Sequence, residues 1–197
     1  MSDRLSDACL DQVFRTARTR NGWTPDRVSE ALIREMYDLA KMGPTSGNCL
    51  PGRFLFLTSE AAKARLAPHM SSGNRPKTLA APVNVITAYD MAFAERLPEL
   101  FPHNPGARDW FTSNEALTRE TAFRNGCLQA AYLMLAARSL GLDCGPMSGV
   151  KLDGINAEFF TGTSWEANFV CNIGYGNDEG LFPRNPRLAF EEACRIL

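Results

Sequence analysis

Apolar residues recur along this chain with two different periods, and the period changes from segment to segment. Apolar positions three or four residues apart predict helices, whereas short runs rich in β-branched residues predict strands. The helical spacing predicts helices at about 5–19, 26–42, from 61, 112–141, 151–160 and from about 188. The strand-like runs lie at about 53–58, 83–89 and 168–174. Because no repeat, low-complexity tract or interdomain linker separates these elements, we expect one domain over residues 1–197.

Two of the helices carry start and stop signals. Thr24 is the candidate N-cap of the helix at 26–42, with Pro25 at its first position. Thr112 and Glu115 form a candidate capping box for the helix at 112–141, and Gly141 is its stop signal.

The helix at 112–141 contains a stretch without any charge, residues 127–137. A helix that is apolar on every face has to be covered on every face. This stretch therefore predicts either the centre of the core or a subunit interface.

Two segments interrupt the regular pattern. Residues 91–112 contain three prolines and a glycine among large aromatic residues, so we expect an irregular excursion there rather than a regular element. The glycine-rich segment 174–180 follows a strand, but its third glycine is one residue late for a dinucleotide fingerprint and no helix follows. We expect a turn at 174–180.

The net charge of −1 and the scattered Lys and Arg residues argue against nucleic acid or an anionic membrane as a partner. No apolar run approaches the roughly 20 residues of a membrane-spanning helix, and the polar, acidic N-terminus does not fit a signal peptide. We therefore expect a cytoplasmic protein. The six cysteines are widely spaced, which favours reduced thiols over disulfides. With only two histidines and no cysteine pair at ligand spacing, we expect no metal site.

Residues 44–48, Pro-Thr-Ser-Gly-Asn, lie between a predicted helix and a predicted strand. Thr45, Ser46 and Asn48 supply hydrogen-bond donors and acceptors without charge, and Gly47 lets the backbone approach a ligand closely. These properties suit a planar heterocycle that carries a phosphate. Taken alone, however, the segment is more typical of a helix end followed by an ordinary turn.

Arginine residues gather in two other segments. Arg18 and Arg20 lie in the segment 17–23, and Arg184 and Arg187 precede the last predicted helix. The guanidinium group is suited to bidentate recognition of phosphate. Each cluster taken singly is more typical of a solvated surface.

Together with the loop at 44–48, these segments resemble the flavin mononucleotide (FMN) site of the nitroreductase superfamily. In that family an N-terminal Arg-x-Ser/Thr element, a Pro-Ser/Thr-Ser-x-Asn loop and a C-terminal Arg-Leu-x-x-Glu-Glu element converge on one cofactor. Asn74 and Lys77 stand where the family places residues beside the flavin pyrimidine edge, and 145–149 resembles its Pro-x-x-Gly turn. The cofactor-binding residues that the resemblance implies are Arg18, Thr19, Pro44, Thr45, Ser46, Asn48, Asn74, Lys77, Met147, Ser148, Gly149, Arg184 and Arg187. Arg18 and Arg187 are expected at the phosphate, because Arg20 and Arg184 match the family pattern less closely.

The resemblance covers nearly the whole chain. It implies an α+β fold with a central, mostly antiparallel sheet flanked by helices, and with the long helix at the interface of a homodimer. It also implies an enzyme that oxidises NADH or NADPH through FMN. The chain has no Gly-x-Ser-x-Gly motif and no histidine in a triad context, which agrees with chemistry carried by a cofactor.

Segments 17–23, 95–102 and 120–125 resemble the malonic semialdehyde reductase branch of pyrimidine degradation. This implies reduction of malonic semialdehyde to 3-hydroxypropanoate. Ser148 and the segment 51–53 depart from the broader family on the substrate side. Two alternatives stay open: a reductase of nitroaromatic compounds or quinones, and a flavin-binding protein without turnover.

The excursion at 95–112 supplies the candidate substrate residues. Its aromatic side chains are expected to cover a substrate stacked on the flavin, with an arginine meeting a substrate carboxylate and a histidine as a possible proton donor. These arginines are equally typical of a solvated loop, and the histidine is more typical of an ordinary loop residue. The candidates are Arg96, Phe101, His103, Arg108, Trp110 and Phe111.

Overall fold

The structure is a computed structural model that describes residues 3–197. Its strands are β1 (Gly22–Trp23), β2 (Gly52–Leu57), β3 (Val83–Asp90), β4 (Asp143–Met147), β5 (Trp165–Gly174) and β6 (Gly176–Asn177). Its α-helices are α1 (Asp7–Leu10), α2 (Glu30–Ala40), α3 (Glu60–Leu66), α4 (Arg75–Ala80), α5 (Leu97–Leu100), α6 (Ala107–Thr112), α7 (Glu115–Ser139), α8 (Leu152–Phe159) and α9 (Phe190–Ala193). Shorter helical turns are the π-helix η1 (Asp11–Arg15) and the 3₁₀ turns η2 (Ser46–Asn48), η3 (Ala67–His69) and η4 (Phe93–Arg96).

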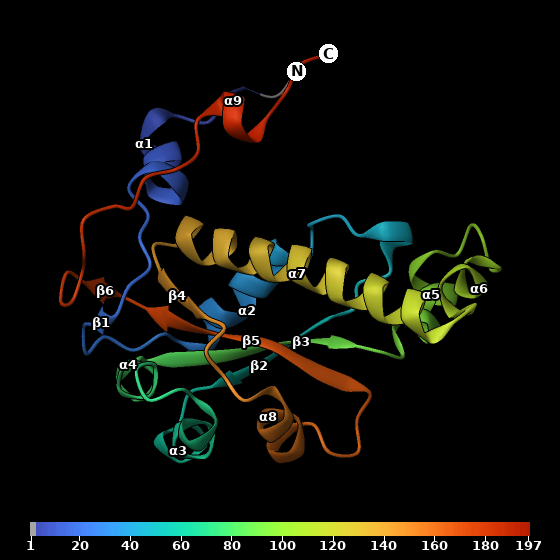
Figure 1. Cartoon of the computed structure of the whole chain (residues 1–197), viewed down its shortest axis with the longest axis horizontal. Helices are drawn as coiled ribbons and strands as arrows, with labels where there is room; N and C mark the ends of the chain where they lie inside the picture. Colours follow the sequence, from blue (N-terminus) through green and yellow to red (C-terminus); the bar gives the residue numbers. More distant parts are fainter. Residues whose placement is uncertain (1–2) are drawn as a thin grey trace.

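The central sheet has four strands in the order β2-β3-β5-β4, and every neighbouring pair is antiparallel. All eight residues of β3 are buried, because helices cover both faces of the sheet. Figure 1 shows α2 and α7 on one face and α3, α4 and α8 on the other. This is the α+β arrangement that the resemblance implied.

Each face of the sheet has its own apolar core. On the α7 side, Val85 and Cys171 of the sheet pack with Leu133 of α7. On the other side, Ile86 packs with Val170 and with Ile155 of α8. All six of these side chains have relative exposures of 1 % or less, so both faces of the sheet are closed within one chain.

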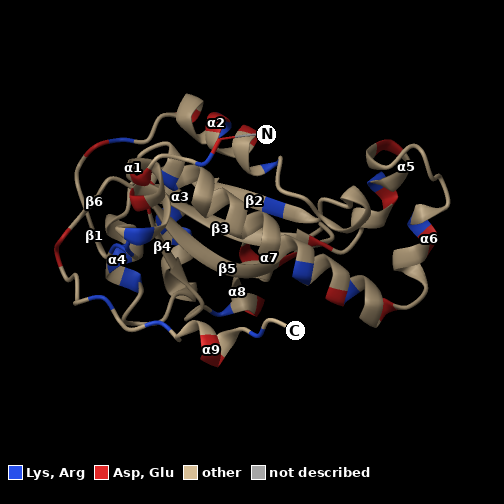
Figure 2. Ribbon diagram, turned by 90° about the horizontal axis from the view of Figure 1, so that it is seen from above, with Lys and Arg blue, Asp and Glu red and all other residues tan. Residues whose placement is uncertain are grey.

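Only one face of α7 is covered by its own chain. Leu133 and Ala137 are buried against the sheet, whereas Phe123, Leu128 and Tyr132 are 49 %, 46 % and 38 % exposed. The charge-free stretch is therefore not enclosed as the centre of the core. Leu128 and Tyr132 lie one turn apart in the charge-free stretch and form an exposed apolar surface, whereas Phe123 lies on another side of the helix, where its ring contacts Tyr89 edge-on. Figure 2 shows several charges on the part of α7 nearest α6.

Both proposed helix starts are corrected. Thr24 bonds to Asp26 in a local turn, and α2 begins later, after Ser29, whose hydroxyl accepts the Leu32 N–H at 3.1 Å. Thr112 ends α6, and the N-cap of α7 is Asn114, whose side chain accepts the Leu117 N–H at 2.8 Å. The stop at Gly141 is confirmed: this residue has a φ of 79° just beyond the end of α7.

Other expected boundaries also differ. The helix expected at 5–19 ends at Arg15 in η1, and the last helix is confined to α9. The excursion at 91–112 contains η4, α5 and α6, so the expectation of no regular element was wrong. No sequence pattern predicted α4, and the resemblance implied a turn at 145–149, where β4 extends to Met147. Pro146 is accommodated in β4 because β4 is an edge strand.

Within residues 3–197, no helix combines the length and the apolar character needed to cross a membrane.

Candidate functional site

A small cavity of about 240 Å³ lies where the N-terminal and C-terminal segments cross. Four arginines line it: Arg18, Arg138, Arg184 and Arg187. None of its described lining residues is acidic, and we call it the arginine pocket. Its other lining residues are Ala17, Thr19, Asn21, Leu181, Phe182, Pro183 and Asn185. Four guanidinium groups without an acidic neighbour make this cavity suited to a multiply charged anion.

Backbone contacts between distant segments build the arginine pocket. Arg18 donates to the Phe182 carbonyl at 2.5 Å, and Arg184 donates to the carbonyls of Arg15 and Ala17 at 2.7 and 2.9 Å. Arg184 therefore joins the two chain segments. Arg187 bonds only to the carbonyls of its neighbours Asn185 and Pro186, so its side chain is not tied to another part of the fold.

Arg20, the weaker phosphate candidate, does not line the pocket. Its guanidinium bonds to Asp143 at 3.4 Å and to Asp178, so it ties the N-terminal segment to β4 and to the turn after β6.

Arg138 was missed by the sequence analysis. It lies at the C-terminal end of α7, directly after the charge-free stretch, and its Nε is buried without a hydrogen-bond partner. Its NH1 group donates to the Val13 carbonyl at 3.3 Å. A buried unsatisfied guanidinium nitrogen is costly. The available signal was a basic residue placed directly after the charge-free stretch 127–137.

Several polar side chains extend from the arginine pocket toward the residues after β4. Lys77 donates to the side chain of Asn21, a lining residue of the pocket, at 3.1 Å. Asn74 donates to the Gly149 carbonyl at 3.2 Å. A Cβ at Gly149 would lie 2.7 Å from Asn74 Nδ2, so no larger residue fits there without a shift. Figure 2 shows basic residues on α4 and on the coil between β6 and α9.

A buried pair of asparagines fixes α4 and hence the position of Lys77. Asn84 donates to the side chain of Asn172 at 2.8 Å and to the Thr78 carbonyl at 2.9 Å, and Asn172 donates to the Lys77 carbonyl at 3.1 Å. Both asparagines have relative exposures of 0 %. Buried polar networks of this kind specify one arrangement of the elements that they join.

The turn at 147–149 exposes backbone atoms to a ligand rather than an apolar side chain. Met147 is 6 % exposed, and its side chain belongs to the core beside α8. Ser148 and Gly149 are exposed. Only the backbone of this turn and the side chain of Ser148 are open to a ligand on this side.

The loop at 44–48 lies in a different part of the molecule. The Ser46 N–H donates to Asn125 of α7 at 2.9 Å, whereas the arginine pocket contains Arg138 of the same helix. Thirteen residues separate these positions, which is about 20 Å along a helix axis. One copy of the chain therefore does not bring the loop, with Pro44, Thr45, Ser46 and Asn48, to the arginine pocket.

The excursion at 95–112 packs against this loop. Asn48 donates to the Leu100 carbonyl at 2.8 Å, and a Cβ at Gly47 would lie 3.5 Å from the ring of Phe111. The ring of Phe101 contacts that of His103 in a tilted arrangement and that of Trp110 edge-on, with centroids 3.9 and 5.9 Å apart. The loop and the candidate substrate aromatics thus form one continuous surface.

Both candidate arginines of the excursion already have carboxylate partners. Arg96 pairs with Glu99 at 2.7 Å, and Arg108 pairs with Glu95 at 2.5 Å. The hydrogen bond from Arg108 holds the pKa of Glu95 below its ordinary value. All four side chains are largely exposed, so these ion pairs are weak and open to exchange with another carboxylate.

The nitroreductase family profile matches residues 15–175 of this chain. A relative from Stenotrophomonas maltophilia, named "Putative NADH dehydrogenase/NAD(P)H nitroreductase", is 55 % identical over 196 residues and covers 100 % of both chains. A protein of the same name from Caulobacter sp. is 54 % identical over 195 residues, covering 98 % of this chain and 99 % of its own. The chain belongs to the nitroreductase family.

Solved structures agree on the fold. A nitroreductase from Exiguobacterium sibiricum in complex with FMN superposes with a TM-score of 0.85 at 21 % identity, over 100 % of both chains. An enone reductase of gut-bacterial fatty acid saturation superposes with a TM-score of 0.82 at 16 % identity, covering 98 % of this chain and 100 % of its own. Since reductases of different substrates share this fold, the fold alone does not define the acceptor.

Proposed function

We propose that this protein is an FMN-dependent NAD(P)H oxidoreductase. The observation that carries the proposal is the arginine pocket and its continuation through Asn21, Lys77 and Asn74 to Gly149. An anion site followed by a polar edge matches the outline of a flavin mononucleotide, with its phosphate at one end and its ring at the other. The family and the names of the relatives support the same cofactor and hydride donor.

The residues present fit FMN by their chemistry. Arg18, Arg138 and Arg187 would hold the phosphate, and Thr19 would bond to the ribityl chain. Lys77 would place a positive charge beside the flavin pyrimidine, where it stabilises negative charge. When bound, the flavin supplies the hydride chemistry. The chain's own task is to bind and orient its ligands at one ring face.

We further propose that the complete site forms between two copies of the chain. The loop at 44–48 contacts α7 at Asn125, whereas the arginine pocket contains Arg138, about 20 Å further along the helix axis. We infer that loop and pocket of one copy do not hold the same FMN molecule. The outward face of α7, with Leu128 and Tyr132, gives a two-fold dimer an apolar surface. In such a dimer the loop of one copy completes the site of its partner.

For the acceptor we propose malonic semialdehyde, reduced to 3-hydroxypropanoate. The proposal rests on the resemblance of segments 17–23, 95–102 and 120–125 to that branch and on the two arginines of the excursion. A nitroaromatic or quinone reductase is the alternative, and a flavin-binding protein without turnover is the second. Anaerobic reduction with NADH or NADPH, followed by a screen of acceptors, separates the three.

The purified protein should be yellow and should release FMN, not FAD, on heating. The arginine pocket suits one phosphate end, and the segment 174–180 contains the last residue of β5 and the whole of β6 rather than a dinucleotide loop. Visible absorption and chromatography of the released flavin check this. A colourless protein that also fails to bind added FMN would contradict the proposed function.

Replacing Arg96 with glutamine should lower kcat/KM for malonic semialdehyde by about 10²-fold and leave an uncharged quinone nearly unaffected, because a substrate carboxylate loses its ion-pair partner. Arg96 is the better of the two candidates, since it also lines a cavity of about 1060 Å³ with Leu100 and Arg53. Arg108→Gln is the matched comparison on the same excursion. If both acceptors slow equally, or neither slows in either variant, the excursion does not recognise the carboxylate.

A further inference from the structure

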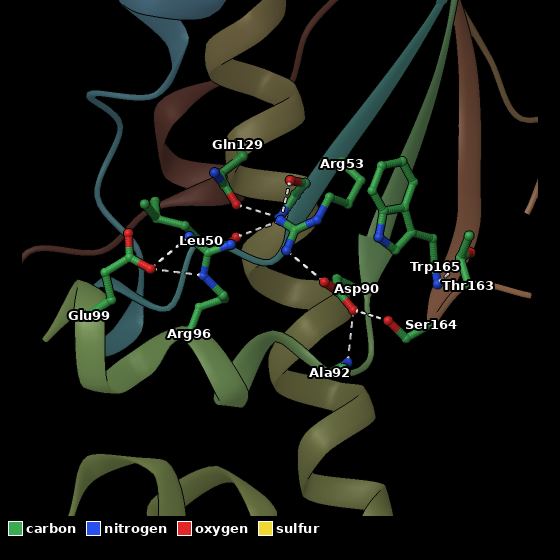
Figure 3. A network of polar contacts seen from close by, with 11 residues as sticks. Leu50, Arg53, Asp90, Ala92, Arg96, Glu99, Gln129, Thr163, Ser164 and Trp165 are labelled. Atoms are coloured by element: carbon green, nitrogen blue, oxygen red, sulfur yellow. Dashed lines mark hydrogen bonds and ion pairs between the residues drawn. The ribbon is translucent and has the colours of Figure 1, made fainter. Parts of the chain in front are cut away.

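Arg53 lies in β2, shortly after the loop at 44–48 in the chain. Its guanidinium contacts backbone carbonyls, a carboxylate and an aromatic ring. NH1 donates to the carbonyls of Leu50 and Gly52 at 3.0 and 2.9 Å, and NH2 donates to Asp90 at 2.6 Å. The guanidinium also lies 5.7 Å from the ring centroid of Trp165. Figure 3 shows these contacts converging on one side chain.

Asp90 is itself anchored to two strand ends. Its second oxygen accepts the Ala92 N–H at 2.9 Å and the Ser164 hydroxyl at 2.5 Å, just after β3 and just before β5. The Asp90 side chain is 10 % exposed and that of Arg53 23 % exposed. A charge-assisted pair at this burial is held in one geometry, so Arg53 connects the Leu50 carbonyl to the rigid sheet.

Leu50 transmits this constraint to the loop. Its carbonyl accepts from Arg53, and its N–H donates to the Thr45 hydroxyl at 3.1 Å. The backbone here is strained: Asn48 and Leu50 have φ angles of 51° and 39°, in the left-handed region that non-glycine residues disfavour. Such a conformation persists only where the surrounding contacts determine it.

We propose that Arg53 is a positioning residue, which holds the loop at 44–50 in the one conformation that presents Thr45, Ser46 and Asn48 to FMN. Arg53 does not itself touch the ligand; it acts through the Leu50 carbonyl. The proposal rests on the proposed function, because it assigns the loop to the flavin site.

The competing explanation is that Arg53 only stabilises the fold as a whole. The labelling rates of two buried thiols distinguish the two explanations. Cys49 lies inside the loop and is 1 % exposed, whereas Cys144 lies in β4 and is 0 % exposed. Burial raises the pKa of Cys49 to about 11, so its thiol reacts with iodoacetamide only when the loop opens. Cys144 reacts only when the core opens. The ratio of the two rates therefore separates local from global opening.

Three variants make the comparison. Arg53→Met keeps the length of the apolar stem and removes the donors, while Arg53→Lys keeps the charge. Arg65→Met is the matched control, because Arg65 also pairs with a carboxylate, Glu158 at 2.6 Å, and also lies over an aromatic ring, Phe159 at 5.0 Å. Arg65 joins α3 to α8, on the face of the sheet opposite to α2 and α7. Labelling is followed peptide by peptide with mass spectrometry, and FMN affinity by fluorescence.

In Arg53→Met, labelling of Cys49 should accelerate about tenfold or more while Cys144 stays at the wild-type rate, and FMN should bind about tenfold more weakly. Arg53→Lys should recover part of both effects, and Arg65→Met should show neither. Equal acceleration of Cys49 and Cys144, or unchanged FMN affinity with an opened loop, would overturn the proposal. If Arg53→Met does not fold, Arg53→Lys and Asp90→Asn decide by the same criteria. A wild-type protein that binds no FMN would defeat the proposed function, and the labelling ratio would still decide whether Arg53 holds the loop.

Discussion

The Leu128→Glu variant should be a folded monomer that no longer binds FMN measurably. Leu128 is 46 % exposed on the outward face of α7, and a carboxylate buried there in a two-fold interface would meet its own copy. An unpaired charge in an apolar interface costs several kcal/mol, and symmetry applies the cost twice. Because each proposed site takes residues from both copies, loss of the dimer removes the site. Light scattering and FMN titration measure the two effects.

A matched control is available on the other side of the sheet. Leu152 of α8 is 39 % exposed, and Leu152→Glu should leave both the dimer and FMN affinity unchanged. A monomeric Leu128→Glu protein that binds FMN normally would place the complete site within one chain. A dimer that survives the substitution would move the interface to another surface.

Mixed dimers test the sharing of the site directly. Asn48→Ala damages the loop, and Arg187→Ala damages the arginine pocket. If one site combines the loop of one copy with the pocket of the other, each variant alone has two damaged sites. A heterodimer then has one intact site and one doubly damaged site. Random mixing of the two variants should restore tight FMN binding at about one site in four. No recovery on mixing would show that loop and pocket belong to the same copy.

The double variant Arg18→Ala/Arg187→Ala should bind FMN about 10³-fold more weakly than wild type. Each charge-assisted hydrogen bond to a phosphate contributes roughly 1.5–3 kcal/mol, and both side chains line the arginine pocket. Arg187→Ala alone should weaken binding by about tenfold to 100-fold. Lys77→Ala should weaken it less and should chiefly slow flavin reduction, because its charge acts on the reduced ring rather than on the phosphate.

Fluorescence titration of apoprotein measures these affinities, and Arg65→Ala, on the far face of the sheet, serves as the control for loss of an arginine. FMN affinity that is unchanged in Arg187→Ala would remove that residue from the phosphate site. A larger loss in Lys77→Ala than in Arg187→Ala would place the phosphate nearer to α4.

The periodic segments of the sequence predicted which helices and strands form. The positions of the helix starts were predicted less accurately, because neighbouring residues compete as N-caps. The apolar run of β3 and the long helix α7 both form where the pattern placed them. Thr24 and Ser29 both carry a hydroxyl that can cap a helix. In the structure Thr24 bonds to Asp26, and Ser29 caps α2. The sequence did not predict β4, because proline normally interrupts a strand. Proline is tolerated in an edge strand, and the edge position of β4 depends on the tertiary structure.

The sequence supplied candidate site residues one by one, but it could not supply their division in space. A motif names side chains and says nothing about which copy of a chain supplies them. For this reason the separation of Ser46 from Arg18 emerged only from their attachment near opposite parts of α7. Arg138 and Arg53 were missed as site residues because neither stands in a recognisable motif. Arg138 follows the charge-free stretch of α7, and Arg53 is the second residue of β2.

Helix α7 also constrains how genes of this kind can change in length. A single inserted residue between Asn125 and Arg138 would lengthen the helix by about 1.5 Å and rotate everything beyond it by about 100°. That one change would displace the loop contact, the apolar outward face and the arginine pocket relative to one another. The excursion at 91–112 is a side branch near the N-terminal end of the same helix. Insertions and deletions should therefore accumulate in the excursion and be purged from α7, which would leave the spacing between Asn125 and Arg138 unchanged while the excursion varies.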